Sequence, residues 1–152
     1  MHARTQIRNA LATLLTGLTT TGANVFTSRV TDYDRENELP ALNIMINEED
    51  HDRAEEAAQM GSIEWRQIEI TIEGRIAAAG TDNIDDDLDQ LALEVELAIA
   101  GDADLGGLLF NNEYAGTSLE LDDEAETVTG LITISYAASY RIDASDPETI
   151  IT

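Results

Sequence analysis

Two long runs of alternating apolar and polar residues constrain the fold of this 152-residue chain more than any other feature. The first, Ser62–Ala78, places isoleucine at every second position from Ile68 to Ile72 and again at Ile76, with polar residues between. The second, Thr127–Ile142, alternates in the same way. Because the side chains of a strand point to opposite faces in turn, each run predicts a long strand with one buried and one solvated face.

The remaining segments predict two amphipathic helices and shorter strands. Thr5–Leu18 carries its apolar residues at helical spacing and is stopped by threonines and Gly22. A second helix, with Asp82 or Asn83 as its N-cap and three aspartates in its first turn, ends at Gly101. Shorter strands are expected over Ala23–Val30, Ala41–Asn47 and Thr117–Leu121, and an exposed acidic loop over Glu48–Met60.

This order predicts one α/β (α+β) domain over residues 1–143, followed by a flexible tail over residues 144–152. The domain would contain a mixed, mostly antiparallel sheet of about five strands, with two helices packed on one face. Gly74 interrupts the first long run, which indicates either a bulge or a close approach of another backbone.

Charge is the outlying property of the composition. The chain has 31 acidic residues against 8 basic ones, all of them arginine, and a formal charge of −23. Such a surface repels the phosphates of nucleic acid. Two interpretations stay open: general solvation suited to a salty environment, or an acidic surface along which DNA passes without sticking.

The residue types that catalysis and cofactor binding need are scarce. The chain has no cysteine, its only histidines are His2 and His51, and no phosphate-binding glycine motif is present. His51 is interpreted as a solvated loop residue, and Trp65 as a packing or interface residue rather than a platform for a base. We therefore expect neither an enzyme nor a cofactor, and no apolar stretch approaches the roughly 20 residues of a membrane span.

One segment is similar to a calcium-binding loop. Asp102 and Asp104 follow a helix, and Glu113 stands at the twelfth position. The exiting helix is missing, and Gly106 replaces an oxygen-bearing ligand. An acidic loop between a helix and a strand is therefore preferred and no metal is expected, with a small calcium-binding module kept as an alternative.

Three segments near the N-terminus, and the order of elements after them, carry a resemblance to a known family. The segments are Ile7–Leu18 (IRNALATLLTGL), Val25–Phe26 and Glu38–Ile44 (ELPALNI). A charged loop, a long amphipathic strand, a helix and a closing hairpin follow. In this pattern the chain resembles the tail terminator proteins of long-tailed bacteriophages, the lambda-like minor tail protein U and related tail completion proteins.

The resemblance implies a structural protein of the virion, located at the head-proximal end of the tail and assembled in the host cytoplasm. Such proteins form a ring, usually of six subunits, which caps the tail tube, stops its polymerisation and offers the head or neck an attachment surface. The implied partners are further copies of the chain, the tail tube protein and a head-tail connector or neck protein. DNA would pass through the lumen without specific binding, and no membrane is involved.

Two other functions stay open at this point. A head-tail completion or neck protein would share the composition and the fold. An acidic mimic of DNA would instead display carboxylates on one face and bind a basic protein.

Three groups of residues are candidates for assembly contacts. Leu93 and Leu97 lie nearly opposite the main apolar stripe of their helix, so they either contact a neighbouring subunit or pack beneath the loop over residues 102–114. Scarce arginines are candidates for ion pairs between subunits: Arg29, Arg66, Arg75 and Arg141. Carboxylates of the acidic loop are candidates for facing the lumen or the tube: Glu48, Glu49, Asp50, Asp52, Glu55 and Glu56.

Overall fold

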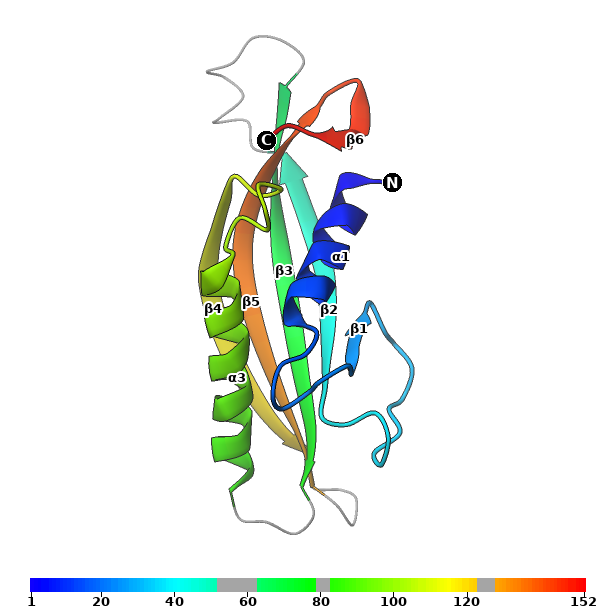
Figure 1. Cartoon of the computed structure of the whole chain (residues 1–152), viewed down its shortest axis with the longest axis vertical. Coiled ribbons are helices and arrows are strands. Elements are labelled where there is room, and N and C mark those ends of the chain that lie inside the picture. The colour runs from blue at the N-terminus through cyan, green and yellow to red at the C-terminus, as the bar shows by residue number, and fades with distance from the viewer. Residues whose placement is uncertain (52–62, 79–82, 123–127) are drawn as a thin grey trace.

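A computed structural model of the chain describes residues 1–51, 63–78, 83–122 and 128–152, and shows an elongated, twisted sheet with both helices on one face (Figure 1). The helices are α1 (Ala3–Leu15) and α3 (Ile84–Gly101). The strands are β1 (Val25–Thr27), β2 (Ala41–His51), β3 (Ile63–Ala78), β4 (Asn111–Asp122), β5 (Val128–Asp143) and β6 (Asp146–Ile150).

The strand order confirms the predicted mixed, mostly antiparallel sheet. It runs β1-β2-β3-β5-β4, and β6 pairs with β5 outside this path. Among the described strands, β1 and β2 pair in parallel and the other pairs are antiparallel. The two long strands that the alternation predicts, β3 and β5, lie side by side at the centre and pair along their whole length.

The core lies between the two helices and the central strands. On β3 and β5 the even-numbered side chains face the helices, and Ile70, Ile72 and Ile134 are at most 1% exposed. Leu11 of α1 and Leu91 of α3 are fully buried against this face. Each such side chain contributes roughly 1.5–3 kcal/mol to stability, so the apolar stripes of the helices explain why both helices lie on the same face.

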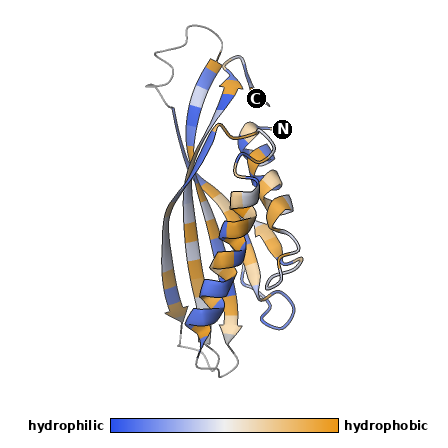
Figure 2. Cartoon of the chain, turned by 60° about the vertical axis from the view of Figure 1, so that its left-hand side comes forward, coloured by the Kyte–Doolittle hydropathy of each residue, from blue (hydrophilic) through white to orange (hydrophobic). Residues whose placement is uncertain are grey.

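The N-terminal end of α3 carries the polar residues that the sequence predicts, although the Asn83 side chain forms no capping hydrogen bond. Asn83 occupies the N-cap position, and the first turn carries Asp85, Asp86 and Asp87. These carboxylates lie at the positive end of the helix dipole. Figure 2 shows the result as a hydrophilic N-terminal end of α3 beneath a more apolar upper part. Within the described part of the chain, neither helix is long and apolar enough to cross a membrane.

Two strands are longer than predicted, and in both a bulge is the reason. The sequence analysis assigned Glu48–Met60 to a loop, but β2 continues through His51, and Glu48 pairs with Glu69 of β3. Similarly, β4 begins at Asn111 rather than at Thr117. The pairing register shifts within each extension, and an inserted residue reverses the alternation of faces, so a period-two pattern ends at that point. The remainder of the predicted loop, residues 52–60, lies outside the described residues.

The C-terminal segment also differs from the prediction of a flexible tail. Residues 146–150 form β6, and Ile150 pairs with Ile142 of β5. The Gln6 side-chain amide of α1 donates a hydrogen bond to the Glu148 carbonyl at 2.7 Å. Ile150 packs at the margin of the core. Contacts with the adjacent β5 and with the distant α1 therefore order a segment whose own residues carry no periodic signal.

Gly74 provides a test of the contact between α3 and the sheet. A Cβ atom at this position would lie 2.6 Å from Leu91 Cδ2 and 2.9 Å from Ile132 Cγ2, so the glycine makes room for two side chains rather than for the bulge or the backbone approach that its position in the sequence predicted. We expect Gly74→Ala to lower the free energy of unfolding by about 1–3 kcal/mol, because both neighbours are enclosed in the core.

Urea denaturation followed by circular dichroism would measure this change, with Gly101→Ala as the matched control. A Cβ atom at Gly101 meets no atom within 4 Å, so this variant should be neutral or slightly stabilising. Equal stability of the two variants would contradict the close packing of α3 on β3.

Candidate functional site

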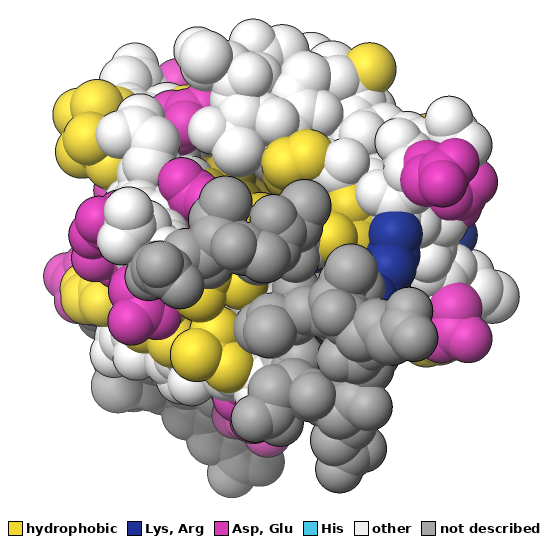
Figure 3. All heavy atoms as spheres, turned by 90° about the horizontal axis from the view of Figure 1, so that it is seen from below, with side chains coloured by type: hydrophobic (Ala, Val, Ile, Leu, Met, Phe, Trp, Pro, Cys, Tyr) yellow, Lys and Arg dark blue, Asp and Glu magenta, His cyan; other side chains and the backbone are white. Residues whose placement is uncertain are grey.

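Arginine and carboxylate side chains are distributed unevenly over the surface. Seen from below, arginine side chains show on the right of the molecule with carboxylates beside them, and further carboxylates and apolar side chains lie on the left (Figure 3). Because the chain has only 8 basic residues, a place where several meet is unusual on this surface.

Three of the eight arginines line one hollow of about 660 Å³, which we call the arginine hollow. Arg29 and Arg35 reach it from the segment between β1 and β2, and Arg75 reaches it from β3. Tyr33 and Val30 also line it. The sequence analysis missed Arg35 and Tyr33, and the only signal for them was the density of arginine and aromatic residues between Phe26 and Arg35.

Arg29 holds this segment in place. Its guanidinium lies 4.5 Å from the ring centre of Phe26 and 4.4 Å from that of Tyr33. Both terminal nitrogens donate hydrogen bonds to the Glu38 carboxylate, a two-point pairing that suits the planar geometry of the two groups. The segment before the strand β2 is thus tied together by one side chain.

The other candidate arginines also have partners inside the subunit. Arg66 forms ion pairs with Glu64 at 2.7 Å and with Glu49 at 3.5 Å, and Arg75 pairs with Glu73 at 2.9 Å. Their role between subunits stays a prediction, and Arg66 is less available for it than Arg75, because its side chain is 20% exposed against 34%.

Arg141 differs from these three in stacking on aromatic rings. Its guanidinium lies 5.2 Å from the ring centre of Trp65 and 5.1 Å from that of Phe110, and no ion pair joins it to another described residue. Trp65 is 3% exposed, which agrees with its interpretation as a packing residue. Phe110 remains 58% exposed beside it.

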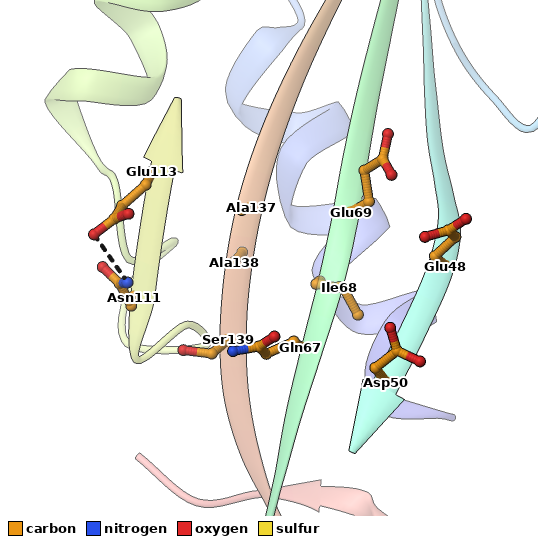
Figure 4. Close-up of a pocket in the computed structure, with 10 residues that line it drawn as sticks. All are labelled: Glu48, Asp50, Gln67, Ile68, Glu69, Asn111, Glu113, Ala137, Ala138 and Ser139. Carbon is orange, nitrogen blue, oxygen red and sulfur yellow. Dashed lines mark hydrogen bonds between the residues drawn. The ribbon is translucent and has the colours of Figure 1, made fainter. Parts of the chain in front are cut away.

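The face of the sheet that carries no helix, here called the open face, holds a second hollow at the opposite end of the strands. This acidic hollow has a volume of about 270 Å³ and spans all four long strands (Figure 4). Its carboxylates are Glu48 and Asp50 of β2, Glu69 of β3 and Glu113 of β4. Of the candidate acidic loop, the structure therefore brings Glu48 and Asp50 to one concave surface.

The bulge in β2 decides which carboxylates reach this hollow. Ile46 pairs with Ile70, but the next pair joins Glu48 to Glu69, so Asn47 is the inserted residue. Its side-chain amide donates a hydrogen bond to Thr71 Oγ1 at 3.1 Å. The insertion reverses the alternation of faces and turns Glu48 toward the open face.

Glu49 consequently points to the other face of the sheet, where it joins a network beneath α1. It accepts a hydrogen bond from the Tyr140 hydroxyl and lies 3.4 Å from Arg4 Nε and 3.5 Å from Arg66 Nη1. Burial and then the contact with Glu49 raise the pKa of Tyr140 above its ordinary value. Glu49 thus links α1 to β2 and β3, away from the acidic hollow. Asp52, Glu55 and Glu56 lie outside the described residues.

Leu93 and Leu97 lie on the solvent side of α3. They are 48% and 64% exposed, respectively. The alternative that they pack beneath the loop over residues 102–114 is therefore wrong, because that loop leaves about half or more of each side chain in contact with solvent. Their contact with a neighbouring subunit stays a prediction.

The three residues of the calcium-loop alternative do not come together around one point. Asp102 Oδ1 accepts a hydrogen bond from the Gly106 amide at 2.9 Å and so caps its own turn. Glu113 belongs to β4 and lines the acidic hollow. No group of three or more His, Asp or Glu side chains arranged to hold a metal ion occurs among the described residues.

Comparison with known proteins identifies the family. The sequence model of phage minor tail protein U matches residues 2–140, which include both helices and the first five strands up to most of β5. The chain belongs to the phage minor tail protein U family. No curated protein matches it.

The match to the phage minor tail protein U family confirms the resemblance derived from the N-terminal segments and the element order. The chain is therefore a structural protein of the phage tail, located in the tail of the virion and assembled with other tail or virion components. Its exposed hollows and apolar side chains are accordingly candidates for contacts between proteins.

The pairing of Glu38 with Arg29 should make the stability of the fold depend on pH. Hydrogen bonds from Arg29, and then from the Asp34 amide, lower the pKa of Glu38 from 4.5 to about 2. A carboxyl whose pKa is lowered in the folded state stabilises the fold above its ordinary pKa, and this contribution disappears as the pH falls from about 4.5 through about 2. We expect the Glu38 carboxyl carbon to titrate near pH 2 in an NMR experiment.

Arg29→Gln provides the comparison, because it removes the ionic partner and should return the Glu38 midpoint toward 4.5. A midpoint near 4.5 in the unchanged protein would contradict the pairing.

Proposed function

We propose that the chain is a tail terminator, which forms a ring, most simply of six subunits, on the last ring of the tail tube. The ring stops polymerisation of the tube and offers the attachment surface for the head or neck. The observation that carries this proposal is the family match over residues 2–140, nearly the whole domain.

The shape of the sheet supports assembly through unlike surfaces. One edge is formed by the short β1 and by the part of β2 beyond it, and the other edge by the long β4, which pairs with β5 alone among the described strands. A contact between two different surfaces of identical subunits repeats from copy to copy, and closes into a ring when the rotation permits. Closure would also protect exposed strand edges from irregular association.

Electron microscopy of the purified protein, alone and mixed with polymerised tail tubes, tests the proposal. We expect six-fold rings, or caps at the ends of tubes, together with tubes that stop growing when the protein is added to the tube subunit. Isolated particles that leave tube ends bare and tube growth unchanged would contradict the terminator function. Binding to head connectors but not to tubes would instead favour a head-tail completion or neck protein.

The acidic hollow supports a further part of this function. Glu48, Asp50, Glu69 and Glu113 lie on the open face, and none of them forms an ion pair with a described residue. If the open face lines the lumen, these carboxylates keep DNA phosphates from binding as the genome passes. Glu49 is better assigned to the fold, because Arg4, Arg66 and Tyr140 already surround it.

Neutralising the four carboxylates to Gln or Asn tests this role. We expect phages that carry the variant to retain tails of normal length but to eject DNA more slowly, because removing four charges per subunit weakens the repulsion. Ejection would be followed by the fluorescence of a DNA dye. Asp104→Asn, which removes a carboxylate outside the hollow, is the control, and equal ejection rates for both variants would refute the role.

A further inference from the structure

The outer side of α3 carries acidic and apolar residues in one row, which we call the α3 row. Asp86, Asp89, Leu93 and Leu97 follow one another at intervals of three, four and four residues, so they lie on the same side of the helix. The aspartates occupy the N-terminal end and the leucines the middle. All four are exposed.

The arginine hollow presents the complementary chemistry. Its Arg35 is exposed, and Arg75 is 34% exposed. Asp32 and Glu73 also line the hollow and Glu73 pairs with Arg75, but Arg75 Nε and Thr129 Oγ1 are buried without a hydrogen-bond partner among the described residues. A carboxylate supplies acceptors only, and it pairs most strongly with a guanidinium.

Val30 adds an apolar element to the same hollow. It lines the hollow and is 94% exposed, the highest exposure of any large apolar side chain in the described part of the chain. The α3 row likewise combines carboxylates with exposed leucines. The two surfaces therefore match in both charge and apolar character.

The positions of the two surfaces permit a ring. The segment between β1 and β2, which carries Arg29 and Arg35, and the N-terminal end of α3 lie at the same end of the molecule, on opposite sides (Figure 1). When the arginine hollow of one subunit binds the α3 row of the next, successive subunits are not displaced along the axis of the ring. A ring closes only without such a displacement.

The net negative charge of each subunit limits which surface of a second copy can bind the arginine hollow. Each copy carries a formal charge of −23, so two copies repel unless a contact places arginine opposite carboxylate. Three of the eight arginines lie in this hollow. A contact through any surface that lacks arginine would bring like charges together, which costs affinity and slows association.

We propose that the arginine hollow of one subunit binds the α3 row of a second copy of the chain, with Asp89 and Asp86 entering beside Arg35 and Arg75 and with Val30 against the leucines. The proposal rests on the proposed ring and names its subunit contact. It assigns Leu93 and Leu97 to the neighbouring subunit and leaves the acidic hollow free.

Charge reversal provides the test, with self-association measured by sedimentation velocity over a range of protein concentrations. Arg35→Glu and Asp89→Arg should each weaken self-association at least tenfold, because each places like charges in contact. The double variant should recover self-association, since opposite charges then face each other again with their positions exchanged. A mixture of the two single variants should also assemble, because each contact then joins either two native or two reversed residues.

Two controls separate this contact from the effect of net charge. Arg8→Glu on α1 changes the charge as Arg35→Glu does, and Asp104→Arg changes it as Asp89→Arg does, yet neither residue belongs to the proposed contact. Both controls should associate like the unchanged protein. Circular dichroism establishes that every variant is folded before its association is compared.

The outcomes distinguish this proposal from the proposed function. If Arg35→Glu associates like Arg8→Glu, or if the double variant is no better than the single ones, the contact is wrong. If the variants still cap tail tubes in the electron microscope, that result leaves the terminator function supported. Absence of self-association of the unchanged protein, both in solution and on tube ends, would overturn the contact and the ring together.

Discussion

The antiparallel pairing of β3 with β5 is the interaction on which the rest of the structure depends. Sixteen residue pairs join the strands from Ile63 and Asp143 to Ala78 and Val128. Because both strands alternate in the same sense, the pairing places their even-numbered isoleucines on one face, where α1 and α3 cover them. A slip by one residue would turn that apolar row to solvent, so burial itself fixes the register.

The strand pairing also sets the position of every candidate surface. β3 carries Glu69 to one end of the open face and Arg75 to the other, which separates the acidic hollow from the arginine hollow. The helices are confined to the opposite face, so no helix covers the open face. The helix-covered face of the sheet thus forms the core. The open face and the outer side of α3 remain available for contacts with DNA and with other proteins.

Identical subunits as acidic as this one repel one another when they assemble. The positions of the few arginines determine where that repulsion can be offset. Arg29 and Arg66 are spent mainly on carboxylates of the same subunit, where they hold the segment before β2 and the network beneath α1. Arg75 also pairs with Glu73, but its side chain is 34% exposed, and Arg35 is exposed as well. A proposed contact built on these two places positive charge at a subunit boundary, where repulsion between copies would otherwise be greatest.

The sequence by itself determined the two helices, the two central strands, the mixed antiparallel sheet and the family, because each rests on a local period or on the order of elements. It marked Gly74 as a special position, but only the packing shows that the side chains of Leu91 and Ile132 are what leave no room for a Cβ atom there. Only the tertiary structure decided the extent of β2 and β4, because a bulge in each interrupts the alternation while pairing with a neighbour continues. The same bulge sends Glu48 and Asp50 to one face and Glu49 to the other, and no local pattern reveals it. The arginine hollow joins residues 29–35 to Arg75 across the sheet, so it exists only once distant segments have packed together.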